Sequence, residues 1–173
     1  ILGCCLVIEL MDRTLRDPLR AERLTGIEVL GALIGWKHLK YRGYTRAINR
    51  KATAYICNRI HSYNKIGKTT IVNLISTEAR EGKSFLAKYM IDYWALAGMK
   101  VKYVSYDVDF MPKSKEYVYA SNYGTLLPNI ANEEFDILLV ECAPLSLYSI
   151  PLALLKEANI NLLVANARRV WKE

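Results

Sequence analysis

Four short runs rich in apolar and β-branched residues, separated by patterns typical of helices, most restrict what this sequence can fold into. The runs are TTIVNLIS (69–76), KVKYVSYD (100–107), DILLVECA (136–143) and INLLVANA (160–167). Strands that are apolar on both faces and alternate with helices form parallel sheets covered by helices on both sides. The sequence therefore predicts an α/β fold with a doubly wound, mostly parallel sheet.

The segments before and between these runs carry further signals. Asp17, Pro18 and Gly26 suit the N-cap, the first turn and the C-terminal stop of a short helix. The segment KSFLAKYMIDYWALAG (83–98) places apolar residues at helical spacing and ends at a glycine. We also expect a short strand over 27–33, a helix over 45–64 capped by Thr45, an irregular loop over 108–122, a short helix over 123–132, and a helix over 149–158 capped by Ser149.

Two triplets in the chain, Gly67-Lys68-Thr69 and Gly82-Lys83-Ser84, end as a phosphate-binding loop does. Such a loop must follow a strand and precede a helix, because its backbone N–H groups and the positive end of the helix together hold the phosphates. The first triplet lies between a helix and a strand, so it is not a phosphate loop. The second lies between a strand and a helix, which predicts a P-loop NTPase type of fold.

The second triplet assigns roles to two side chains. Lys83 would contact the β- and γ-phosphates, and the Ser84 hydroxyl would bind Mg²⁺. Thr77 occupies the place of the first glycine in the full GxxxxGK[ST] pattern. Asp107 and Glu141 each end a predicted strand, at the edge where α/β proteins bind ligands, and are candidates to position the metal. The alternative is that these two acids only cap the loops that follow them.

The charge of the chain is unevenly distributed. The formal net charge is +7, and there is no Asp or Glu from Val29 to Thr77. This block indicates either an anionic partner, such as lipid headgroups, an acidic subunit or nucleic acid, or simply a solvated basic face. The basic residues of the block are Lys37, Lys40, Arg42, Arg46, Arg50, Lys51, Arg59, Lys65 and Lys68.

The four cysteines, Cys4, Cys5, Cys57 and Cys142, show neither CxxC spacing nor a neighbouring His. We expect them to be reduced and mostly buried, not disulfide partners or metal ligands.

The first ten residues, ILGCCLVIEL, are apolar but shorter than the roughly 20 residues that a membrane span needs. Four arginines follow at positions 13, 16, 20 and 23, as they do at the cytoplasmic end of a transmembrane helix. Residues 1–10 are therefore either the tail of such a helix or a buried segment of a globular domain.

Several segments together resemble one family, the cytoplasmic domains of bacterial polysaccharide co-polymerases with their associated tyrosine kinases. These segments are DRTLRDPLRAERLTGIEVLGAL, EGKS, GMKVKYVSYDVD, FDILLVECAPL and INLLVANARRVW. The resemblance divides the chain into a transmembrane tail (1–10), a juxtamembrane linker with a short helix and strand (11–44), and a P-loop-like α/β domain (45–173) that is incomplete at its C-terminus.

The resemblance also implies ligands and partners. Mg-ATP or Mg-ADP would be held by the Walker A loop, with Arg80, Glu81, Gly82, Lys83 and Ser84, and by acids of the Walker A′ and Walker B motifs. The implied partners are the inner membrane, on its cytoplasmic face, further copies of the chain in a ring, and the polysaccharide polymerase and export machinery. Nucleic acid is not among them.

The sequence departs from the family pattern at several of these positions. Arg80 replaces a glycine where the backbone lies close to phosphate and is expected to have positive φ, which a Cβ penalises. Its side chain would compensate for that cost by contacting phosphate itself. Ser105 replaces the first acid of Walker A′, leaving Asp107 as the candidate for metal and catalysis. Glu141 replaces the Walker B aspartate, and being one methylene longer it reaches a metal only if something shifts. The predicted helix over 45–64 has arginines but lacks the acid of the family's oligomerisation helix.

The resemblance and these departures together predict an oligomerising, regulatory domain of an exopolysaccharide chain-length determinant, kinase-like but with a degenerate ATP site. One alternative is an active tyrosine autokinase of the same family, and another is a partition-type ATPase. Tyr117, Tyr119 and Tyr123 are predicted to be packing residues and not a phosphorylated tail.

Overall fold

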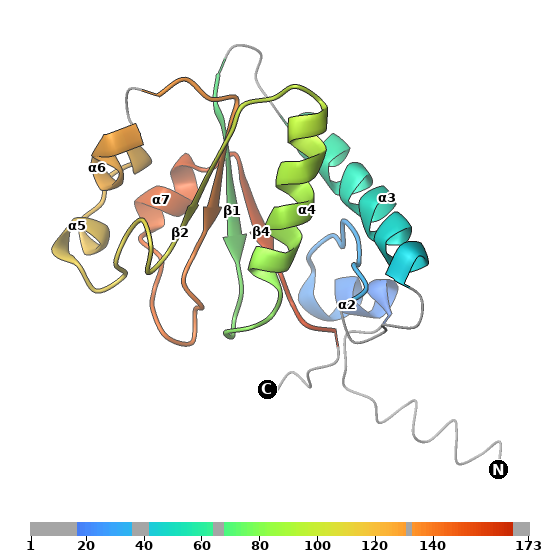
Figure 1. Cartoon of the computed structure of the whole chain (residues 1–173). Coiled ribbons are helices and arrows are strands. Elements are labelled where there is room, and N and C mark those ends of the chain that lie inside the picture. The colour runs from blue at the N-terminus through green and yellow to red at the C-terminus, as the bar shows by residue number, and fades with distance from the viewer. Residues whose placement is uncertain (1–16, 36–41, 64–67, 131–132, 168–173) are drawn as a thin grey trace. The chain divides into compact units, whose positions relative to one another are not determined.

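The structure is a computed structural model that describes residues 17–35, 42–63, 68–130 and 133–167 (Figure 1). The chain divides into two compact units, one spanning residues 30–165 and the other residues 1–29 with 166–173. The larger unit contains the helices α3 (Arg42–His61), α4 (Lys83–Leu96), α5 (Lys115–Val118), α6 (Tyr123–Leu126) and α7 (Leu152–Glu157), the short 3-10 helix η2 (Pro128–Ile130), and the strands β1 (Thr70–Ile75), β2 (Val101–Ser105), β3 (Ile137–Glu141) and β4 (Ile160–Leu163). The described part of the smaller unit contains α2 (Pro18–Thr25).

The four described strands form one sheet in the order β2-β3-β1-β4, and every pair of neighbours is parallel. The chain passes from β1 to the edge strand β2, returns to β3 between them, and then crosses to β4 on the other side of β1. Each of the four predicted strands is therefore present, and the α/β fold class with a parallel sheet is confirmed.

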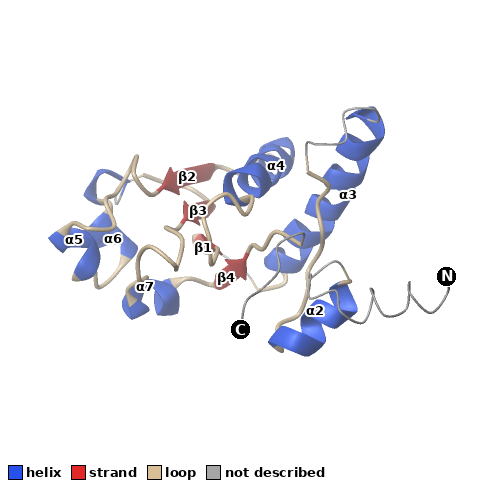
Figure 2. Ribbon diagram, turned by 90° about the horizontal axis from the view of Figure 1, so that it is seen from below, coloured by secondary structure: helices blue, strands red, loops and turns tan. Residues whose placement is uncertain are grey.

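Helices cover both faces of this sheet, as Figure 2 shows. On one face, α4 and α3 enclose an apolar cluster that includes Ile60, Leu74, Met90 and Trp94. On the other face, the segment with α5, α6 and α7 encloses a second cluster. It includes Phe110, Tyr117, Tyr123, Val140 and Leu154. Burial on both sides explains why the strands are so apolar in sequence.

One polar residue, Asn73, lies fully buried in the middle of β1. Its amide nitrogen donates to Oδ1 of Asn161 at 2.9 Å, and Asn161 is its direct partner in the register of β1 and β4. Its amide oxygen accepts from the Tyr123 hydroxyl at 2.6 Å. The side chain of Asn73 is thus bonded at both ends, as a buried amide must be to avoid a large desolvation penalty.

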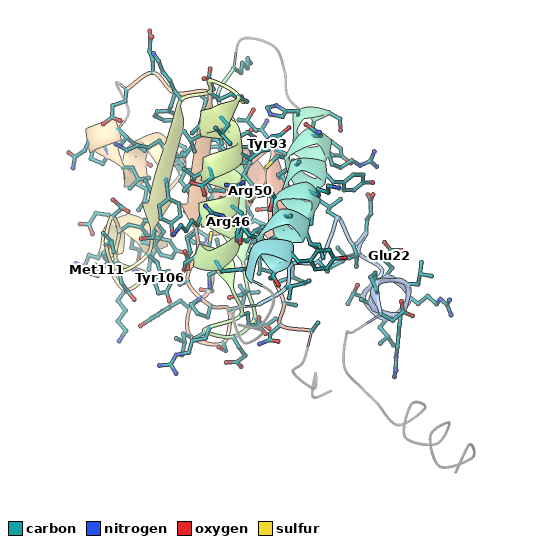
Figure 3. The ribbon with its side chains drawn as sticks, turned by 45° about the vertical axis from the view of Figure 1, so that its right-hand side comes forward. Glu22, Arg46, Arg50, Tyr93, Tyr106 and Met111 are labelled. Carbon is teal, nitrogen blue, oxygen red and sulfur yellow. The ribbon has the colours of Figure 1, made fainter. Side chains whose placement is uncertain are left out.

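The helix α3 packs against α4 over much of its length, and Figure 3 shows Tyr93 of α4 beside α3. The hydroxyl of Tyr93 donates to Oδ1 of Asn58 on α3 at 2.7 Å. Arg46 and Arg50 are exposed on α3. The basic character predicted for this segment therefore lies partly on the surface.

Caps predicted from sequence are confirmed for α2. The Asp17 side chain accepts from the backbone N–H of Leu19, and Pro18 is the first helical residue. Gly26 ends the helix with φ 67° and donates its N–H to the carbonyl of Glu22. A positive φ is the backbone state that glycine adopts without the steric cost of a Cβ.

The strand predicted over 27–33 is wrong, because residues 27–35 have no regular structure. Their backbone groups bond to side chains instead of to a neighbouring strand. The Asn49 amide bonds both the N–H and the carbonyl of Ile34, at 2.8 and 2.9 Å. Leu30 and Leu33 still pack on the apolar cluster beside α3 and α4, so the apolar pattern indicated burial correctly but not strand pairing.

Three predicted boundaries also differ from the structure. The helix predicted from Thr45 begins at Arg42, so Thr45 lies in its first turn and does not cap it. Pro151, not Ser149, is the N-cap of α7, and it contributes no side-chain hydrogen bond. The irregular loop predicted over 108–122 contains the single turn α5.

Among the tyrosines predicted to pack, Tyr117 and Tyr123 are buried, whereas Tyr119 is 82% exposed. Cys57 and Cys142 are free and buried, and burial raises the pKa of each thiol to about 12. Cys4, Cys5 and the predicted transmembrane tail (1–10) lie outside the described residues. Of the helices in the described ranges, none has both the length and the apolar character needed to cross a membrane.

Candidate functional site

The segment from Ser76 to Gly82 connects the end of β1 to the start of α4, the order that a phosphate loop requires. Gly82 is the N-cap of α4, with φ 105° and no side chain, so the first N–H groups of the helix do not donate to a capping side chain. Gly67 lies outside the described residues, but the order around the first triplet is α3 and then β1. The order of elements therefore supports the second triplet and not the first.

Arg80 lies in the left-handed region with φ 63°, which confirms the expected conformation at the position where it replaces a glycine. Such a conformation costs a residue with a Cβ about 1 to 2 kcal/mol. Thr77, which also stands in the place of a glycine, does not have positive φ. The two departures from the loop pattern are thus unequal, since only Arg80 imposes a backbone cost.

The carboxylate of Glu81 holds the first half of the loop together. It accepts from the Thr77 hydroxyl at 3.1 Å and from the backbone N–H of Glu78 at 3.3 Å. Glu81 is buried, so these bonds are shielded from water. This residue therefore stabilises the loop from within.

The loop that follows β3 is joined to the phosphate loop by hydrogen bonds. The N–H of Leu145 donates to the carbonyl of Ser76, and the N–H of Ser146 donates to the carbonyl of Thr77, both at 2.9 Å. The Ser146 hydroxyl also donates to the Glu78 carboxylate at 3.1 Å. The two loops therefore form one connected structure at the end of the sheet.

The ammonium group of Lys83 lies inside this structure with 4% of the residue exposed. It donates to the Ser76 hydroxyl at 2.7 Å and lies 5.6 Å from the centroid of the Tyr106 ring. Figure 3 shows Tyr106 beside the end of α4 at which Lys83 lies. Burial lowers the pKa of Lys83 below its ordinary value, while the nearby Glu141, Cys142 and Glu81 oppose this shift. A buried cation held by one neutral hydroxyl is suited to receive an anionic ligand.

Ser84, the next residue of α4, is paired with Glu141 at the end of β3. The Ser84 hydroxyl donates to Oε1 of Glu141 at 2.9 Å. The other oxygen, Oε2, accepts from the Tyr103 hydroxyl at 2.5 Å. Burial and the bond to Glu141 both raise the pKa of Tyr103, so its hydroxyl remains a donor. The structure therefore brings together three of the predicted residues, Lys83, Ser84 and Glu141.

Asp107, the other predicted acid, is arranged differently. It is exposed, it has φ 65°, and its N–H donates to the carbonyl of Phe110 at 2.9 Å. Within the described residues, its carboxylate makes no hydrogen bond to Lys83, Ser84 or Glu141. Its charge acts on Tyr106, whose pKa is raised first by burial, then by Glu141 and then by Asp107.

Four residues that the sequence did not single out belong to this site, namely Ser76, Tyr103, Tyr106 and Asp109. Asp109 accepts the backbone N–H of Ser105 at 2.7 Å, so its carboxylate lies beside the end of β2. Ser76 directly follows β1, and Tyr103 lies two residues before Ser105 on the same side of β2. Strand alternation could have indicated Tyr103, whereas the turn that returns Asp109 has no sequence pattern of its own.

Among the described residues, no group of three or more His, Cys, Asp and Glu side chains could hold a metal by itself. Magnesium in nucleotide sites keeps several waters and takes only one or two protein groups, the rest being phosphate oxygens. The Ser84 hydroxyl, exposed and already bonded to a carboxylate, fits that requirement.

The fold is similar to that of a solved structure, the kinase domain of Escherichia coli tyrosine kinase ETK, with a TM-score of 0.62. The match covers 87% of this chain and 82% of that one, at 14% sequence identity. Comparisons with protein-family models and with curated proteins gave no match. At this identity the likeness shows the fold alone, and that fold agrees with the α/β class with a parallel sheet that the sequence predicted.

Proposed function

We propose that this chain is a tyrosine-kinase-like domain that binds Mg-ATP or Mg-ADP in the loop 76–84 and acts mainly as a regulatory, oligomerising part of an exopolysaccharide chain-length determinant. The observation that carries the proposal is the hydrogen bond from Ser84 to Glu141 beside the buried ammonium of Lys83. It joins a hydroxyl, a carboxylate and a cation at the start of one helix, which is the arrangement a phosphate-bound magnesium ion requires.

In this proposal each residue has a definite task. The N–H groups at the start of α4 and the Lys83 ammonium bind the β- and γ-phosphates, with Lys83 leaving the Ser76 hydroxyl to do so. The Ser84 hydroxyl donates a hydrogen bond to Glu141 and offers the lone pairs of its oxygen to the metal. Magnesium, when bound, neutralises charge on the phosphates. The exposure of Arg80 supports an additional contact of its side chain with phosphate.

The residues at the end of β2 support the proposal that phosphoryl transfer by this domain is weak. The Walker A′ position is Ser105, and the exposed Asp107 has no hydrogen bond to the other site residues. Phosphoryl transfer depends almost wholly on positioning and electrostatic stabilisation, so an acid that nothing positions is a serious loss. Binding without efficient turnover is the behaviour these features favour.

The cellular part of the proposal rests on the sequence and on the shared fold. The arginine-rich segment after residues 1–10 supports attachment to the cytoplasmic face of the bacterial inner membrane through a preceding helix. We infer that the partners are further copies of the chain, in a ring, and the polysaccharide polymerase and export machinery.

A calorimetric titration with Mg-ADP and Mg-ATP tests the nucleotide part. We expect saturable binding by the wild-type chain and none by Lys83→Ala, since that change removes the cation from the phosphate site. Lys88→Ala is the matched control, because Lys88 is an exposed lysine of the same helix, α4, beyond its first turn. Absence of wild-type binding at millimolar nucleotide would refute the proposal, as would equal binding by Lys83→Ala.

An active tyrosine autokinase is the second candidate, and the intact Ser84 to Glu141 bond favours it. Incubation of the chain with labelled Mg-ATP separates the two. Incorporation of phosphate on tyrosine that is lost in Lys83→Ala would establish the kinase, while binding without incorporation supports the regulatory domain.

A further inference from the structure

Glu141 is a longer side chain than the aspartate expected at its position, and the structure shows how that extra length is accommodated. A glutamate has one more rotatable bond than an aspartate, so an unsupported carboxylate would spread over several positions. Here both oxygens are bonded, Oε1 to the Ser84 hydroxyl at 2.9 Å and Oε2 to the Tyr103 hydroxyl at 2.5 Å. Removing the Tyr103 hydroxyl would free one side of the carboxylate.

Tyr103 is well placed to hold Glu141. In the register of β2 and β3, Ser105 pairs with Glu141 and Tyr103 pairs with Leu139. Side chains two residues apart on a strand share a face, so Tyr103 is the diagonal neighbour of Glu141, within reach of a long aromatic side chain. The Tyr103 ring packs on the apolar cluster next to α4, which fixes the direction of its hydroxyl.

We propose that Tyr103 is a positioning residue that orients Glu141 toward Ser84 and so sets the affinity of the site for a divalent cation bound with nucleotide phosphates. This inference rests on the function proposed above. Tyr103 does not touch the ligand in this account. It acts through Glu141, which accepts the hydrogen bond of the Ser84 hydroxyl and so leaves the lone pairs of the Ser84 oxygen for the metal. Tyrosine and glutamate together would thus do what a shorter aspartate does alone.

The proposal is tested by measuring the ADP dissociation constant with magnesium and again with magnesium removed by chelation, for the wild type and Tyr103→Phe. Phenylalanine keeps the ring and its packing but removes the hydroxyl. We expect the gain in affinity that magnesium provides to fall by about tenfold in Tyr103→Phe, the lower end of the usual effect of losing an outer partner of a metal ligand. The affinity without magnesium should stay unchanged.

Tyr93→Phe is the matched control, because it removes a hydroxyl that bonds Asn58 between α4 and α3, and it should leave both constants as in the wild type. Glu141→Asp gives an independent measurement, since an aspartate is too short to keep both partners. We expect the magnesium-dependent gain of Glu141→Asp and of the double variant Tyr103→Phe/Glu141→Asp to be equal, because the tyrosine has nothing left to position.

The outcomes are distinguishable. A wild-type chain that binds no nucleotide overturns the proposed function, and this inference with it. If the wild type binds and Tyr103→Phe retains the full gain from magnesium, only the inference is overturned. Equal weakening with and without magnesium would assign Tyr103 a purely structural role, and additive losses in the double variant would also contradict the proposal.

Discussion

The ends of β3 and β2 lie side by side at one edge of the sheet, yet their acids are held in opposite ways. At the end of β3, both oxygens of Glu141 are bonded and the residue is 6% exposed. At the end of β2, Asp107 is exposed, and in the described part of the chain its carboxylate bonds none of the other site residues. A buried carboxylate needs partners, whereas an exposed one is solvated and needs none. The acid at the end of β3 is therefore held in one position by neighbouring side chains, whereas the acid at the end of β2 is not.

The largest effect should come from replacing the two acids in turn. We expect Glu141→Ala to lower the gain in ADP affinity that magnesium provides by about 100-fold, at the upper end for losing a partner of a metal ligand. Asp107→Ala should leave that gain within the error of the measurement. Titrations with and without magnesium provide the comparison. Equal losses at the two positions would mean that Asp107 at the end of β2 takes part in metal binding as much as Glu141 at the end of β3 does.

A second and smaller effect concerns pH. Burial lowers the pKa of Lys83, and only its charged form attracts phosphate. As pH rises through this lowered pKa, in a window below the ordinary lysine value of 10.5, the lysine loses its proton and ADP affinity should fall. The decrease approaches about tenfold per pH unit once the free lysine is neutral.

The same titration of Lys83→Arg is the control for this pH dependence, since a guanidinium stays charged throughout the range. Its affinity should not fall in that window. A wild-type profile that is as flat as that of the arginine variant would show that the Lys83 charge does not contribute to binding.

The smallest effect compares the two non-glycine residues with positive φ, Arg80 in the phosphate loop and Asp107 after β2. Arg80→Gly should raise the free energy of unfolding by about 0.5 to 1 kcal/mol, because the relieved steric cost exceeds the added entropy of the unfolded chain. Asp107→Gly should gain less, because aspartate tolerates the left-handed region better than arginine. Urea unfolding measures both, with Arg80→Ala as the control that keeps a Cβ. A larger gain at Asp107 would reverse this order.

The sequence predicts much of the fold because strands that are buried on both faces, such as β1 and β3, are continuous apolar runs in the sequence. The same argument places Lys83 and Ser84, since a glycine-lysine-serine triplet between a strand and a helix has few structural interpretations. Glu141 follows from its place at the end of a predicted strand. Local pattern and chain order thus suffice for these residues.

Other features depend on contacts between distant segments, which local pattern does not specify. Residues 27–33 are apolar enough for a strand, but the Asn49 amide bonds the backbone of Ile34 beside them instead. The hydroxyl of Tyr103 meets Glu141 only because β2 and β3 are neighbours in this register. Asp109 reaches the backbone of Ser105 through a turn whose shape the residue types alone do not determine.

The hydrogen bond between Asn73, which is buried, and Asn161, which is exposed, has a consequence for the alignment of the strands. If β1 were purely apolar, its register against β4 could shift by one residue and apolar side chains would still be buried. Any such slip would separate the two amides and leave the buried Asn73 amide without this partner and away from water, at a cost of about 1 to 3 kcal/mol. The hydrogen bond between the two asparagines therefore fixes the register of β1 and β4. Since β1 leads directly into the phosphate loop, this register also determines where that loop begins.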